Sequence, residues 1–205
     1  MSARSRTINI LQAVMNLLIV LLFALLAISS FHQYLASRAL QTFGVLAVNA
    51  LFLALFLARR PAREETRSPV LWALSFAGTA LPLLLRPAAQ RHGLHIGPLL
   101  ELAGIVMLVA ALLSLRRSFA VVPGNRGIQH GGMYRLVRHP VYLAELTLLL
   151  GLVLANPTVR NAVIWACECA LELARARAEE RFLAADPAYR AYRTRVRYRL
   201  IPWVA

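Results

Sequence analysis

The sequence of 205 residues contains no lysine, only nine acidic residues and two cysteines. Cys167 and Cys169 lie two positions apart in one apolar run, where helical side chains point in different directions and cannot easily bridge. This spacing excludes a disulfide framework, and the sequence predicts no metal site. Charged residues make up only 16% of the chain and hydrophobic residues 59%, which excludes an ordinary soluble domain. We therefore expect an integral membrane protein.

Six apolar runs bounded by charge are candidates for membrane-spanning helices. They cover residues 8–30, 39–58, 68–86, 97–115, 140–155 and 159–178. Only Asn156, Pro157 and Thr158 join the last two, so these runs must form an antiparallel hairpin. Its first arm supplies roughly 22 Å of helix, less than a full hydrocarbon thickness. The sequence predicts an all-α, polytopic membrane bundle of about six spans that ends in a helical hairpin.

All 23 basic residues are arginine, and they are distributed unevenly among the predicted loops. If the six spans alternate across the membrane, nineteen arginines lie on one side and four on the other. Cytoplasmic loops are enriched in basic residues, so both termini are predicted to be cytoplasmic. The net charge of +14 then reflects topology and attraction to anionic membrane lipids, and we expect no nucleic-acid partner.

Two segments on the predicted cytoplasmic side are too long to be simple connectors, residues 116–140 and the tail beyond about residue 174. They flank the terminal hairpin in the sequence. Because its outer turn is short, the beginning of the first arm and the end of the second must meet on one face. We therefore divide the chain into N-terminal transmembrane helices, residues 1–115, and a core of loop, hairpin and tail, residues 116–205, whose site would lie at the cytoplasmic membrane surface.

The second arm of the hairpin carries a stripe of charged residues. Glu168, Glu172, Arg175 and Glu179 are separated by four, three and four positions, which places them on one helix face. A charge inside a span costs about 2.5–3.5 kcal/mol unless it pairs or lines a wet cavity. The stripe is predicted to face the protein interior, either as an ion network between helices or as part of a functional site. Glu145 in the first arm has the same two interpretations.

The loop before the hairpin carries residues suited to binding a charged ligand: Gly131, Gly132, Tyr134, Arg138, His139, Pro140 and Tyr142. The glycines permit a tight turn and a close approach of the backbone to a ligand. Pro140 suits the first position of a helix, so Arg138 and His139 precede a helix N-terminus, which attracts carboxylates and phosphates. The tyrosine rings suit a cation. The alternative interpretation is a snorkelling arginine with tyrosine anchors at the membrane interface.

These residues also form part of a longer pattern. The run from Tyr134 to Tyr142 is followed about 37 residues later by Glu179-Glu180, and then by Tyr189, Tyr192 and a closing Ile201-Pro202. The combined pattern resembles the isoprenylcysteine carboxyl methyltransferase family, which belongs with the phospholipid methyltransferases and other small membrane methyltransferases. The resemblance covers about residues 113–202.

The resemblance implies an enzyme that binds S-adenosylmethionine between loop and tail and methylates a lipophilic acceptor arriving from the bilayer. It places these residues at the cofactor: Gly132, Tyr134, Arg138, His139, Pro140, Tyr142 and Glu180. It places Arg175 and Glu179 at the catalytic centre. The cofactor's carboxylate would suit Arg138 and His139, and its ammonium or ribose hydroxyls would suit Glu180. The sequence determines neither the acceptor group, whether carboxylate, amine or thiol, nor the oligomeric state.

Three other classes stay open. A small transporter would move protons or cations through the intramembrane carboxylates Glu145, Glu168 and Glu172. A nicotinamide-dependent membrane reductase is an alternative, because membrane sterol reductases share part of the fold that the resemblance implies. A non-catalytic scaffold would keep the fold and bind no cofactor.

Overall fold

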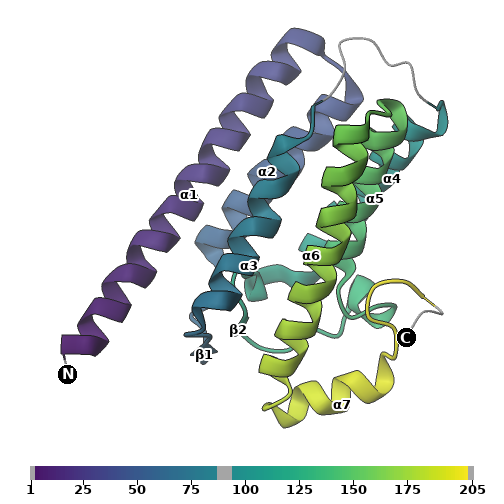
Figure 1. Cartoon of the computed structure of the whole chain (residues 1–205). Coiled ribbons are helices and arrows are strands. Elements are labelled where there is room, and N and C mark those ends of the chain that lie inside the picture. The colour runs from purple at the N-terminus through teal and green to yellow at the C-terminus, as the bar shows by residue number, and fades with distance from the viewer. Residues whose placement is uncertain (1–2, 87–93, 203–205) are drawn as a thin grey trace. The chain divides into compact units, whose positions relative to one another are not determined.

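The computed structural model describes residues 3–86 and 94–202, and this part of the chain is mostly helical (Figure 1). The chain divides into two compact units, Met1–Ala58 and Arg59–Ala205, which are described separately below. Three segments are long and apolar enough to cross a membrane: Ala13–Ser37, Leu40–Ala58 and Ile96–Ser118. They indicate a membrane protein. The apolar helices at the third and fifth predicted spans are shorter, so the total of six spans stays a prediction.

The first unit is a pair of apolar helices, α1 (Ala3–Ser37) and α2 (Leu40–Ala58), which run side by side (Figure 1). The ring of Phe23 stacks on that of Phe52 at a centroid distance of 5.1 Å. Many other apolar side chains of the pair are exposed, as expected of helix surfaces that face lipid. These helices confirm the first two predicted runs, although α1 extends beyond its predicted run at both ends.

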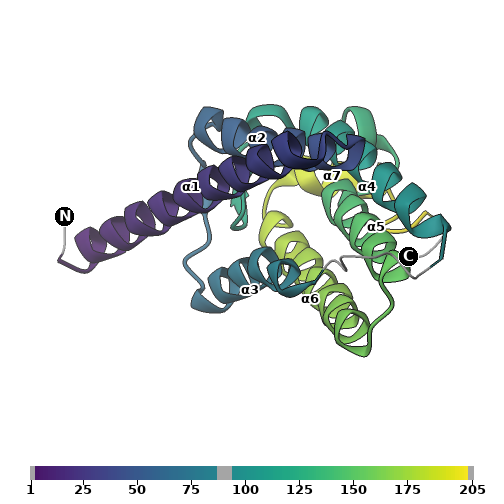
Figure 2. The ribbon, with the colours of Figure 1, turned by 90° about the horizontal axis from the view of Figure 1, so that it is seen from above.

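The second unit holds the remaining described helices, α3 (Pro69–Ala80), α4 (Ile96–Leu115), α5 (Pro140–Ala155), α6 (Val159–Leu183) and α7 (Pro187–Arg195). Figure 2 shows α6 between α3 and α5, with α4 packed on the other side of α5. A short antiparallel ribbon pairs β1 (Glu64–Glu65) with β2 (Gly124–Asn125). Turns of 3₁₀ helix extend or link these elements at Leu81–Leu84, Arg116–Ser118 and Gly132–Arg135.

Polar caps fix where helices of the second unit begin. The side-chain oxygens of Ser68, Thr158 and Asp186 accept from backbone N–H groups two or three residues on, at 3.4, 3.1 and 2.8 Å. The third predicted run, 68–86, is not one helix, since its last turn is 3₁₀. Pro82 lies in that turn and cannot donate the backbone hydrogen bond that an α-helix needs there.

Glycines bring α4 and α5 into close contact. A Cβ added to Gly104 would collide with the backbone of Leu148, and one added to Gly151 would collide with the backbone of Glu101. Small residues allow this approach, which is common between helices in membranes. The middle and the end of α5 are therefore held firmly against α4.

The hairpin of α5 and α6 places the charged stripe inside the second unit. Three residues separate the helices, as predicted, and the indole N–H of Trp165 donates to the carbonyl of Leu146 at 3.1 Å. Glu168, Glu172 and Arg175 are all buried, which confirms that the stripe faces the interior. The second arm is longer than the predicted run 159–178, because α6 continues to Leu183.

Candidate functional site

The turn before α5 is tied to the C-terminal segment by backbone hydrogen bonds. The N–H groups of Arg138 and His139 donate to the carbonyls of Tyr198 and Arg199 at 2.9 and 3.0 Å. The guanidinium of Arg138 also donates to the carbonyls of Val196 and Arg197, at 2.9 and 2.6 Å. These N–H groups and this side chain therefore have protein partners at the position where the sequence suggested an anion site.

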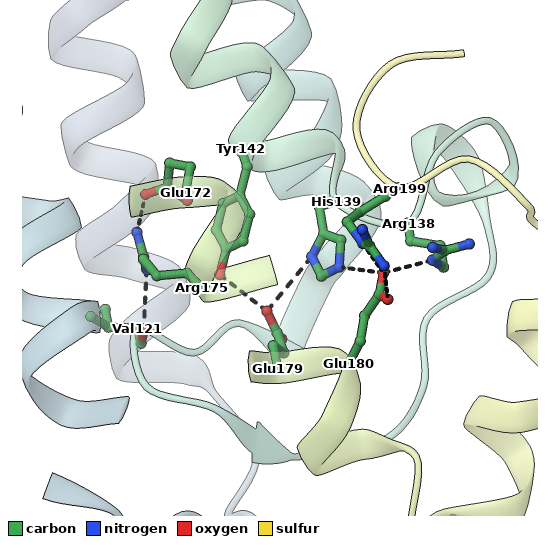
Figure 3. A network of polar contacts seen from close by, with 9 residues as sticks. All are labelled: Val121, Arg138, His139, Tyr142, Glu172, Arg175, Glu179, Glu180 and Arg199. Carbon is green, nitrogen blue, oxygen red and sulfur yellow. Dashed lines mark hydrogen bonds and ion pairs between the residues drawn. The ribbon is translucent and has the colours of Figure 1, made fainter. Parts of the chain in front are cut away.

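Glu180, near the end of α6, joins the turn before α5 to the tail (Figure 3). Its carboxylate accepts from Nε of Arg138 at 2.7 Å and lies 3.2 Å from Nε2 of His139. Arg199 adds hydrogen bonds from Nε and Nη2 at 3.1 and 3.0 Å. Burial alone would raise the pKa of Glu180, but the hydrogen bonds from His139, Arg199 and Arg138 outweigh it and hold this pKa well below its usual range.

This cluster predicts an acid-sensitive fold. With the Glu180 pKa depressed in the folded state, the unfolded chain binds more protons below the ordinary value of 4.5. The contribution of Glu180 is thus fully present above about pH 4.5 and is lost as pH falls toward the folded pKa. We expect the free energy of unfolding in detergent to fall more steeply with acid in the parent than in Glu180→Gln. Equal slopes in the two proteins below pH 4.5 would contradict this expectation.

A second carboxylate, Glu179, lies on the other side of His139 (Figure 3). The hydroxyl of Tyr142 donates to Glu179 at 3.0 Å, and Nδ1 of His139 is 3.7 Å from the same carboxylate oxygen. The rings of His139 and Tyr142 stack with a centroid distance of 5.3 Å and an angle of 6°. One imidazole thus lies between two adjacent glutamates, with its orientation fixed by the Tyr142 ring.

Arg175 lies on the far side of the Tyr142 ring, with its guanidinium 4.9 Å from the ring centroid (Figure 3). It forms an ion pair with Glu172 one turn earlier, and its Nη2 is 3.5 Å from the carbonyl of Val121. Gly78 of α3 makes room for this pair, because an added Cβ would lie 2.6 Å from Nη1 of Arg175. The stripe on α6 is therefore both an ion network and a support for Tyr142.

A cavity of about 100 Å³ opens beside these residues. Its walls come from the loop that follows α4, from the beginning of α5, from the end of α6 and from α7. Two buried polar atoms of lining residues, the hydroxyl of Tyr189 and Nη1 of Arg126, have no hydrogen-bond partner in the described part of the chain. Burial and the nearby Glu180 and Glu179 carboxylates raise the pKa of Tyr189, so its hydroxyl stays protonated at neutral pH.

The structure brings five of the nine predicted site residues to this cavity, namely Tyr134, Arg138, His139, Tyr142 and Glu179. The other four lie behind its wall. Pro140 is the buried first residue of α5, Glu180 holds Arg138 and His139, and Arg175 supports Tyr142. Gly132 has a φ of +55°, and a side chain there would collide with Ser114. Its role is thus to shape the loop.

The sequence reasoning did not identify Arg126 as a site residue. Nε of Arg126 donates to the carbonyl of Arg60 at 3.1 Å, and Nη2 donates to Glu65 at 2.8 Å. These contacts depend on the pairing of β1 with β2, two strands of only two residues each. An alternating pattern cannot be recognised in so short a strand, although the pair of acidic residues at Glu64-Glu65 was a visible signal.

Residues 70–196 match the model of the family described as "Protein of unknown function (DUF1295)". The matched segment begins in α3, ends just after α7 and contains every residue that lines the cavity. None of the curated proteins matches the chain. Because the match covers more than half of the 205 residues, the chain belongs to the DUF1295 family of proteins of unknown function.

Proposed function

We propose that this protein is an S-adenosylmethionine-dependent methyltransferase of the membrane, with its cofactor site at the cavity beside His139 and Glu179. In this proposal the acceptor arrives from the bilayer, the chain has six spans with both termini in the cytoplasm, and the cavity opens at the cytoplasmic surface. One observation carries the proposal. The two halves of the methyltransferase-like pattern meet, since Tyr142 bonds to Glu179 and His139 to Glu180 although 37 and 41 positions separate them.

The donor set of the cavity fits this cofactor. The unpartnered Nη1 of Arg126 and hydroxyl of Tyr189 suit the carboxylate and other acceptor groups. Glu179, whose side chain is 29% exposed, is the one carboxylate among the residues that line the cavity, and its negative charge complements the positive charge of the cofactor. A volume of about 100 Å³ is smaller than the roughly 300–1,000 Å³ of ligand pockets, so the cavity must widen on binding.

S-adenosylmethionine supplies an electrophilic methyl group for direct in-line transfer, for which alignment is the main requirement. Glu180 aligns His139, and the Tyr142 hydroxyl aligns Glu179. Glu179 then takes the proton of an acceptor that starts protonated. Nε of Arg175 is buried and has no partner among the described residues. We therefore assign to Arg175 the role of binding a negatively charged group of the acceptor. Glu180 and Arg138 act by positioning, because they bond to each other.

Calorimetry on the detergent-purified protein tests this proposal directly. We expect the parent to bind S-adenosylmethionine and S-adenosylhomocysteine with micromolar Kd. His139→Ala removes the stack on Tyr142 and the contacts to both glutamates, so we expect a Kd at least about tenfold higher, equivalent to about 1.4 kcal/mol. Arg135→Gln is the matched control, because Arg135 is exposed in the same loop and does not line the cavity.

Two results would change the assignment. A parent that binds neither compound at millimolar concentration would contradict the methyltransferase proposal. Binding of NADPH at the same site, with no binding of S-adenosylmethionine, would instead favour the membrane reductase. If the cofactor binds as expected, transfer of a labelled methyl group to carboxylate, amine and thiol acceptors with lipid chains identifies the substrate class.

A second candidate is a carrier of protons or cations. Both carboxylate oxygens of Glu168 and Oε2 of Glu172 are buried and have no hydrogen-bond partner in the described part of the chain. Intramembrane carboxylates of this kind commonly mark proton or ion pathways. The carrier gives no role to His139 or to cofactor binding, so the calorimetry above separates the two candidates.

A further inference from the structure

A second cavity, of about 530 Å³, lies along the hairpin of α5 and α6 beside the C-terminal segment. Its walls are mainly apolar, with Leu143, Leu146 and Leu150 on α5 and Trp165 and Leu173 on α6. It shares no lining residue with the cavity at His139. We call it the hairpin groove.

The hairpin groove uses a different helix face from the candidate active site. On α6 it is lined by Trp165, Cys169, Leu173 and Arg177, each four positions from the next. The charged stripe on the same helix instead follows Glu168, Glu172, Arg175 and Glu179. At about 100° per residue, Cys169 and Leu173 point well away from their neighbours in the stripe. The groove is therefore a separate site.

One end of the hairpin groove continues into a basic pocket of about 320 Å³. Arg177 and Arg199 line both hollows, and Arg181 and Arg193 complete the basic wall of the second. Glu180 is the one carboxylate among the residues that line the basic pocket, and Arg138 and Arg199 already pair with it. In the part of the chain that the structure describes, the side chains of Arg177, Arg181 and Arg193 make no hydrogen bond or ion pair. Their positive charges are thus free to meet a ligand.

The dimensions and charge of the two hollows suit one kind of ligand. Trp165 and Arg177 lie about 18 Å apart along α6, at 1.5 Å per residue. One leaflet of a bilayer contributes roughly 15 Å of hydrocarbon, half of the whole core. An acyl chain in the groove therefore brings its headgroup to the level of Arg177 and Arg199, where an anionic phosphate meets the unpaired guanidinium group of Arg177 beside Arg199, which is paired with Glu180.

We propose that the hairpin groove and its basic pocket form a binding site for an anionic phospholipid, with an acyl chain against α5 and α6 and the phosphate at Arg177, Arg193 and Arg199. This site goes beyond the methyltransferase proposal and does not depend on it. Zwitterionic phosphatidylcholine offers the same acyl chain without the net negative charge. Glycerol phosphate offers the anion without the chain. The proposed site requires both parts in one molecule.

The first experiment measures lipid binding to the full chain, delipidated in a neutral detergent, by native mass spectrometry. We expect phosphatidylglycerol to bind more tightly than phosphatidylcholine and glycerol phosphate not to bind. Each basic residue is expected to raise the affinity for an anionic lipid about fivefold. The double variant Arg177→Gln/Arg193→Gln should therefore bind phosphatidylglycerol about 25-fold more weakly. The control removes equal charge through Arg135→Gln/Arg195→Gln, at exposed arginines that line neither hollow.

The second experiment locates the lipid and leaves every arginine in place. The thiol of Cys169 lines the hairpin groove, and Cys167→Ser leaves it as the single cysteine. We expect phosphatidylglycerol to slow maleimide modification of Cys169 several-fold at concentrations where phosphatidylcholine has no effect. Equal binding by the two double variants, equal affinity for the two lipids or an unprotected Cys169 would each overturn the proposal.

Discussion

Glu180→Gln is expected to destabilise the protein by about 3–5 kcal/mol, the usual cost of removing one partner from a buried ion pair. The substitution keeps the shape of the side chain and removes its charge. Arg138 then stays buried, with 6% of its side chain exposed, and has lost its counter-charge, while one of the two acceptor oxygens becomes an NH2 donor among the donors of Arg138, His139 and Arg199. Unfolding in detergent, followed by circular dichroism, measures the change in the free energy of unfolding.

Glu64→Gln is the matched control for this measurement. It also neutralises one glutamate, but Glu64 is exposed on β1, where such a change alters stability by no more than about 0.5 kcal/mol. A similar fall in the free energy of unfolding in both variants would mean that net charge, rather than the cluster at Glu180, determines the stability. A small loss in both would contradict the central role assigned to Glu180.

Gly104→Ala is expected to have the second large effect. We expect the free energy of unfolding to fall by about 3 kcal/mol or more, at the upper end of the range for overpacking, so that little folded protein is obtained. The new Cβ would collide with the backbone nitrogen and Cα of Leu148. Shortening Leu148 to alanine cannot relieve this contact, because the backbone of α5 remains in place. We therefore expect Gly104→Ala/Leu148→Ala to be no better folded than the single variant, as judged by the monodisperse yield from size exclusion.

The control for crowding is Gly131→Ala. Nothing lies within 4 Å of a Cβ added there, and Gly131 has an ordinary negative φ of −99°. We expect this variant to fold like the parent. Normal folding of Gly104→Ala would show that α4 and α5 can separate, and it would contradict the close packing described above.

The bounds of the hairpin were predictable because its helices begin and end at residues whose effect on the backbone is local. Pro140 starts α5 and the turn at Asn156, Pro157 and Thr158 ends it, so the predicted run 140–155 matches the helix. The third run was harder, since its apolar composition does not reveal the change to 3₁₀ helix at Pro82. The helix α7 was missed, although Asp186-Pro187 is a good cap followed by a good first residue.

The candidate site was predictable where side chains of distinctive type converge. Its ring pair and both glutamates belong to the pattern that resembles the methyltransferases, and the hairpin brings them together. The partners of Arg138 were not predictable, because the carbonyls of Val196 and Arg197 have no sequence signature. The position of Arg126 was equally hidden, since it depends on a ribbon with two residues in each strand.

The glycine contact between α4 and α5 also has a consequence for the proposed cofactor site. Neither helix can rotate about its axis without a backbone collision at Leu148 or Gly151, and the same rigid α5 carries Tyr142 in its first turn. Room for a ligand larger than about 100 Å³ must come from the opposite wall, formed by the loop after α4 and by α7. If the proposed cofactor binds here, we expect its association to be gated, with a rate at high ligand concentration that is limited by the opening of that wall rather than by diffusion.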